Sequence, residues 1–93
     1  MKKSGVILPE ACSDEEAVAI VSQADELTLS LWRQIRRITG YPDDVGLNAA
    51  LTAVARAAAL LLSHSDNRVS SREAFMACLD TNLERVDSPG YDA

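Results

Sequence analysis

The sequence predicts an all-α fold, a three-helix antiparallel bundle whose middle helix is buried and which we expect to be completed by dimerisation. Three observations support this prediction. Apolar residues recur at spacings of three and four, which is the period of an α-helix. Signals that start and stop helices divide the chain into three segments. Ala supplies 14 of the 93 residues and aromatic residues only 4%, a composition that favours closely packed helices over a sheet.

The first helix is expected at about 13–39. Ser13 and Glu16 have the spacing of a capping box, in which each side chain accepts a hydrogen bond from the backbone N–H of the other residue. At the other end, Gly40 suits the left-handed conformation that follows many helices, and Pro42 cannot continue a helix. The segment is therefore delimited at both ends by local chemistry.

The second helix is expected at about 44–63, with Asp43 or Asp44 as its N-cap. Because the connection is short, the two helices should fold back as an antiparallel hairpin. On a helical wheel the polar residues of this segment occupy an arc of about 80°. The rest divides into a stripe of large residues and a nearly opposite stripe of small residues, and two apolar stripes need two partners. The small-residue stripe consists of Ala49, Ala53, Ala57 and Leu60.

The third helix is expected at about 71–86, since Ser70 and Glu73 repeat the capping-box spacing after a polar loop. Its apolar side, with Phe75 and Leu79, should face the core. Residues 1–12 show no helical period, so we expect a flexible lead-in, a single domain over 13–87, and a loose tail at 88–93.

Composition and charge narrow the range of partners. The net charge of −5 argues against nucleic acid or an anionic membrane as the main partner. The segment 45–62 is long enough to span a membrane, but Asn48, Thr52 and Arg56 interrupt it, so we expect no membrane span. The two cysteines belong to no Cys/His cluster, which indicates a reducing compartment, the cytoplasm.

The first helix has a wider apolar arc than one neighbouring helix would cover. The hypothesis is therefore a noncatalytic protein-binding or scaffold protein, acting as a homodimer or with another helical protein. The alternative is that so small a domain simply exposes some apolar residues. The candidate interface consists of Val18, Leu29, Trp32, Ala49, Ala53, Ala57 and Leu60.

Two charged clusters have a functional and a simpler interpretation. Arg33, Arg36 and Arg37 are a candidate site for docking a partner or an anion, although they also complement the helix dipole. A nucleic-acid-associated regulator that uses these arginines, and a carrier of a hydrophobic ligand, remain alternative functions. The second cluster is a candidate acidic docking strip, or a solvated helix face, formed by Glu73, Asp80, Glu84 and Asp87.

No constellation of side chains in the sequence predicts catalysis. The only histidine, His64, stands beside Ser63, Ser65 and Asp66, but neighbours in sequence do not define the geometry of a triad. The Glu-x-x-His pair that would mark a carboxylate-bridged metal site is missing from the sequence. We therefore expect no enzyme activity, no metal and no cofactor.

Overall fold

A computed structural model describes residues 5–40 and 43–87 of the chain. They form three helices, α1 (Asp14–Thr39), α2 (Asp44–Leu62) and α3 (Arg68–Asp87). No strand occurs in these two ranges, so the prediction of an all-α fold with three helices is confirmed. The expected tail at 88–93 and the first four residues of the lead-in lie outside the described residues.

Both ends of α1 and the start of α2 are formed by the residues that the sequence indicated. Ser13 Oγ accepts from the Glu16 N–H at 3.1 Å, and Glu16 Oε1 accepts from the Ser13 N–H at 3.0 Å. Gly40 has a φ of 67°, and its N–H donates to a carbonyl of the last turn of α1. Asp43 Oδ1 accepts from the Gly46 N–H at 2.7 Å and so caps α2. All three predicted caps, at Ser13, Gly40 and Asp43, are confirmed.

The start of α3 differs from the prediction. The helix begins at Arg68, and Asn67 Oδ1 accepts from the Ser70 N–H at 3.1 Å, which is the bond of an N-cap side chain. Ser70 is therefore already inside the helix, and its spacing to Glu73 does not form a capping box. Asn is as good an N-cap as Ser, so an earlier cap was available.

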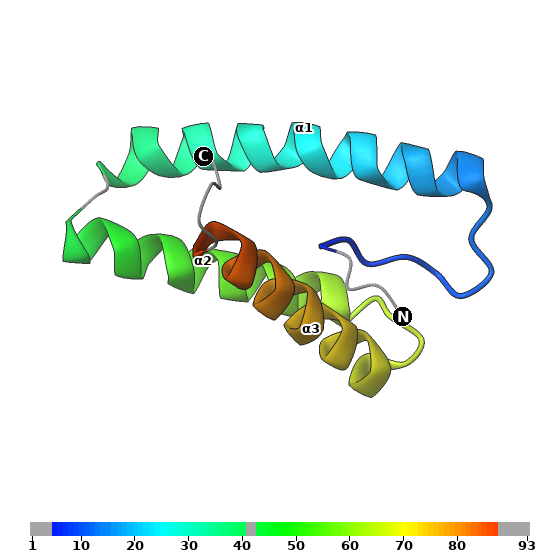
Figure 1. Cartoon of the computed structure of the whole chain (residues 1–93). Coiled ribbons are helices and arrows are strands. Elements are labelled where there is room, and N and C mark those ends of the chain that lie inside the picture. The colour runs from blue at the N-terminus through cyan, green and yellow to red at the C-terminus, as the bar shows by residue number, and fades with distance from the viewer. Residues whose placement is uncertain (1–4, 41–42, 88–93) are drawn as a thin grey trace.

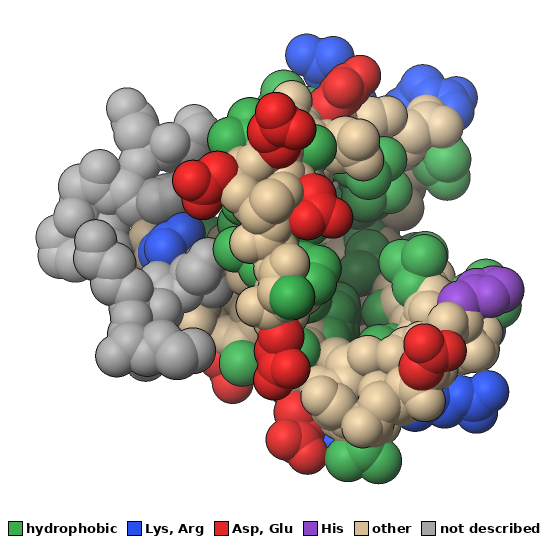
Figure 2. All heavy atoms as spheres, turned by 90° about the vertical axis from the view of Figure 1, so that its right-hand side faces the viewer, with side chains coloured by type: hydrophobic (Ala, Val, Ile, Leu, Met, Phe, Trp, Pro, Cys, Tyr) green, Lys and Arg blue, Asp and Glu red, His purple; other side chains and the backbone are tan. Residues whose placement is uncertain are grey.

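α1 and α2 form an antiparallel hairpin, and α3 crosses α2 (Figure 1). α2 contacts both other helices, whereas the described parts of α1 and α3 do not approach each other. The three helices therefore leave one side open instead of enclosing a common core. In Figure 1 the gap between α1 and α2 widens away from their connection, and Figure 2, viewed from that wide end, shows hydrophobic side chains lining a hollow.

The prediction of a buried middle helix is wrong. Among the described residues of α2, only Gly46 and Ala50 are buried, and both lie in its first two turns. Further along, Leu51 is 59% exposed and Leu61 is 74% exposed. The reason is geometric, because α1 and α2 are close only near their connection and α3 covers one side of α2 only.

The lead-in contacts α3 instead of extending away from the helices. The Gly5 carbonyl oxygen accepts from Asn82 Nδ2 at 3.0 Å and from Cys78 Sγ at 3.2 Å. In Figure 1 this segment, drawn in blue, turns back from the start of α1 toward α3. Gly5 and Val6 are half-buried as a result.

The packing near the connection of α1 and α2 can be tested by substitution of Ala50. Replacing the buried Ala50 by Leu would insert three carbons at a site that is already covered, and we expect it to lower the free energy of unfolding by about 1–3 kcal/mol. The matched control is Ala59→Leu in the exposed part of the same helix, which should change it by less than about 0.5 kcal/mol. Urea denaturation followed by circular dichroism measures both. Equal effects would show that Ala50 is no more tightly packed than Ala59.

Candidate interaction surface

The chain exposes far more surface than a compact protein of its size. Its accessible area is 8037 Å², whereas a compact monomer of 10.0 kDa exposes about 5,200 Å². The radius of gyration is 14.6 Å, against about 12 Å for a compact domain of this length. Large apolar side chains contribute to the excess on all three helices.

The residues outside the described ranges do not account for this excess. If these twelve residues are given the full surface of an unfolded chain, they contribute roughly 1,900 Å². The rest of the chain then still exceeds the surface of a compact domain of its own mass by roughly 1,400 Å². The helices themselves therefore carry uncovered surface.

One uncovered surface runs along α1 and includes three of the predicted interface residues. We call it the outer stripe, and it comprises Val18, Val21, Leu29 and Trp32. These four side chains fall within about 80° on a helical wheel. Val18 is 69% exposed, Leu29 57% and Trp32 47%. The structure thus brings Val18, Leu29 and Trp32 together on a face that the other helices leave exposed.

The other four predicted interface residues lie on α2. Ala49, Ala53 and Ala57 are exposed, and Leu60 is 68% exposed. Small side chains permit a close helix to approach, but such a row does not specify which helix. These positions stay a candidate surface without an assigned partner.

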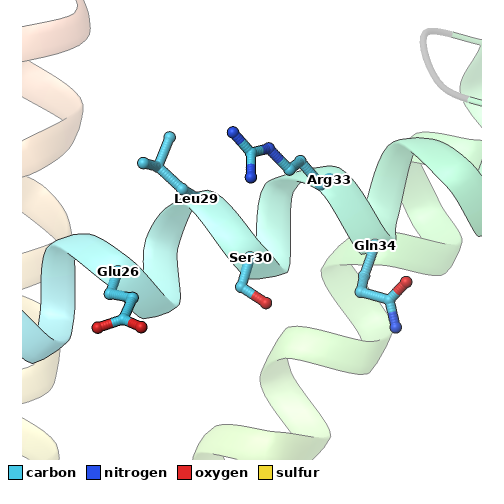
Figure 3. Close-up of a pocket in the computed structure, with 5 residues that line it drawn as sticks. All are labelled: Glu26, Leu29, Ser30, Arg33 and Gln34. Carbon is cyan, nitrogen blue, oxygen red and sulfur yellow. The ribbon is translucent and has the colours of Figure 1, made fainter.

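The three predicted docking arginines are all exposed near the end of α1. The Arg37 guanidinium donates to Gln34 Oε1 from Nε at 2.9 Å and from Nη2 at 2.7 Å, so it is held along the helix. Arg33 lines a shallow depression on α1 together with Glu26 and Leu29 (Figure 3). Because a carboxylate shares this depression, the arrangement suits a partner with both charges better than a simple anion.

The predicted acidic strip on α3 is exposed at all four positions, Glu73, Asp80, Glu84 and Asp87. Sequence reasoning missed the apolar stripe beside it. Leu79 was expected to face the core but is 47% exposed, because α3 contacts its neighbours through other residues, among them Ala74 and Cys78, which are half-buried. A helical wheel shows an apolar side but not which part of it is covered. The exposed stripe consists of Val69, Met76, Leu79, Leu83 and Val86.

Neither a metal centre nor a known relative defines the site. Within residues 5–40 and 43–87, no group of three or more His, Cys, Asp or Glu side chains is placed to hold a metal ion. Among the helices of the same ranges, α2 alone is long and apolar enough to cross a membrane, judged by length and composition. Comparisons with protein family models, curated proteins and solved structures found no match.

One of the three acidic side chains at the start of α1, that of Glu16, takes part in the helix cap. The Ser13 N–H and then the Ser13 hydroxyl lower the pKa of Glu16, since both hydrogen bonds favour its ionised carboxylate. The ionised form thereby stabilises the folded state, and this contribution is lost as the pH falls through the lowered pKa. Glu16 therefore belongs to the helix cap, and Asp14 and Glu15 in the same turn are exposed as Glu16 is.

The effect of Ser13 on the pKa of Glu16 can be tested by substitution at Ser13. In Ser13→Ala the hydroxyl is lost but the Ser13 N–H, the larger cause, remains, so we expect the pKa of Glu16 to rise part of the way toward its ordinary value. Carbon-detected NMR titration of the Glu16 carboxyl measures the change. Thr28→Ala, which removes a hydroxyl bonded within the same helix, should leave that pKa in place. An unchanged Glu16 pKa in Ser13→Ala would show that the Ser13 hydroxyl does not lower it.

Proposed function

We propose that this chain is a noncatalytic helical protein that binds protein, and that its first partner is a second copy of itself. The excess of accessible surface carries this proposal. A chain must bury enough apolar surface to offset the conformational entropy that it loses on folding. With Gly46 and Ala50 the only buried residues in the described ranges, a second chain is the natural source of the missing burial.

The available area meets the requirement of a stable dimer. A standard interface buries about 800 Å² on each partner, and obligate dimers bury more with a more apolar surface. The accessible area of the described chain exceeds that of a compact domain by roughly 1,400 Å². This excess is larger than the area that one partner buries in a standard interface. Self-association also accounts for the many exposed Leu and Val side chains, which scattered surface exposure explains less well.

In this proposal the α1 outer stripe and the α2 row are the surfaces through which the chain acts. The chemistry is packing of apolar helix faces, with the charged residues setting the orientation of the partner. A different helical protein bound on the same faces is the competing outcome of the experiment below. It would give a monomer in the pure protein and a complex in its presence.

The mass of the pure protein in solution tests the proposal. Sedimentation equilibrium at micromolar concentration should give about twice the chain mass of 10.0 kDa. Because unfolding of an obligate dimer also separates the chains, its thermal midpoint should rise with protein concentration. A monomer that unfolds cooperatively, with a midpoint independent of concentration, would exclude self-association as the way in which this chain completes its core.

A further inference from the structure

We propose that two copies pair through α1 in an antiparallel arrangement. The outer stripe forms the contact, and the basic end of each α1 lies beside the acidic end of the other. This inference rests on the proposed self-association and specifies its surface and direction. The observations that carry it are the exposure of the stripe and the distribution of charge along α1.

Charge is ordered along α1 in a way that suits pairing with itself. The first turn carries Asp14, Glu15 and Glu16, and the basic residues begin at Arg33 and continue to the last turn. On a helical wheel Asp14 and Arg36 lie within about 60° of the Val18 and Leu29 side chains. The outer stripe therefore runs from an acidic end to a basic end, and an antiparallel partner presents the opposite charge at each.

The register of this pairing follows from where the charges lie. If the two-fold axis passes near the midpoint between Asp25 and Glu26, Arg36 of one copy faces Glu15 of the other. The same operation brings Leu29 and Trp32 of one copy over the first half of the partner's stripe. In such a two-fold contact every favourable pair occurs twice.

The outer stripe carries a shallow depression in which a partner side chain can pack. It is lined by Ala17, Val18, Val21, Ser22 and Asp25. The depression lined by Leu29 and Arg33 (Figure 3) lies about 115° further round the helix and outside this contact.

Charge also argues against a parallel pair. It further favours the outer stripe over the second exposed apolar side of α1, which we call the inner edge. A parallel pair would place Arg36 beside Arg36 and Glu15 beside Glu15, and like charges in contact are strongly unfavourable. The inner edge exposes Leu27, Leu31 and Ile38, yet the arginines lie on other sides of the helix. Only the outer stripe combines exposed apolar side chains with both charged ends.

Charge reversal tests the antiparallel register. One variant carries Arg33→Glu and Arg36→Glu, and the other carries Asp14→Lys and Glu15→Lys, with Glu16 left in the helix cap. Each alone should weaken the dimer at least about tenfold in dissociation constant, because like charges then meet at both ends. An equimolar mixture should form a heterodimer of near wild-type strength, seen by native mass spectrometry. Arg72→Glu, at an exposed position of α3, is the matched control and should leave the dimer intact.

The outcomes of this experiment are decisive in either direction. Circular dichroism must show that each variant keeps its helices, since reversal also acts on the α1 dipole. Variants that stay helical, dissociate singly and recombine as a heterodimer support the antiparallel pair. Helical variants that remain homodimers, or that fail to recombine, overturn it.

A pair of leucines of equal exposure tests the stripe itself. Leu29 is 57% exposed on α1 and Leu83 is 56% exposed on α3. Leu29→Glu should give a monomer at micromolar concentration, whereas Leu83→Glu should stay dimeric. Asp25→Asn should tighten the dimer, because it removes like charges that meet near the two-fold axis.

These variants separate the two proposals. If the wild type is a dimer and Leu29→Glu is also a dimer, self-association stands and the α1 contact is overturned. Loss of the dimer in Leu83→Glu instead would place the contact on α3. A wild-type monomer overturns both.

Discussion

The close contact between α1 and α2 near their connection is the constraint on which the remaining structure depends. Gly46 and Ala50, the two buried residues of α2, lie in its first two turns next to this connection. Ile35 and Thr39, in the last two turns of α1, are half-buried on the same arc of their helix. Beyond this point the two helices diverge, and α3 is positioned by α2 and by the hydrogen bonds of Asn82 and Cys78 to the Gly5 carbonyl oxygen. A contact at one end of a hairpin fixes the direction of the helices without covering their length.

That geometry explains why so apolar a chain has so small a core. Each helix carries enough large side chains to form a bundle, but covering them requires a neighbour along the whole length of each face. In the described structure, α2 has α1 on one side near the connection and α3 on another, and its remaining surface is exposed. The apolar side chains that a core would bury are thus exposed, and their burial against a partner would be favourable.

Local features were predictable from the sequence, and long-range ones were not. The capping box at Ser13, the left-handed Gly40 and the cap at Asp43 depend on residues within three or four positions of each other, so short patterns identify them. Burial of α2 depends on the angle at which two distant helices meet, and a helical wheel does not contain that angle. The contact of Gly5 with Asn82 spans most of the chain and leaves no periodic signal.

The site was predicted in the same uneven way. That the first helix carries more apolar surface than one neighbour covers could be counted from the sequence, and Val18, Leu29 and Trp32 are exposed together. Phe75 and Leu79 were both assigned to the core, but Phe75 is half-buried and Leu79 is exposed, because exposure depends on which side of α3 faces α2. Half-burial of Ala74 and Cys78 shows that the packed side is displaced from the most apolar one.

The charges of α1 have an explanation within one chain, and it is incomplete. Acidic residues in the first turn and basic residues in the last turn stabilise the helix dipole, but this effect falls off within one turn of the end. The last turn of α1 contains Arg36 and Arg37, whereas Arg33 lies before it, beside the outer stripe. A second α1 in the opposite direction accounts for Arg33 as well, since its acidic end then faces this region. It also sets the two helix dipoles antiparallel, so the charge order that stabilises each helix is the one that selects the direction of the pair.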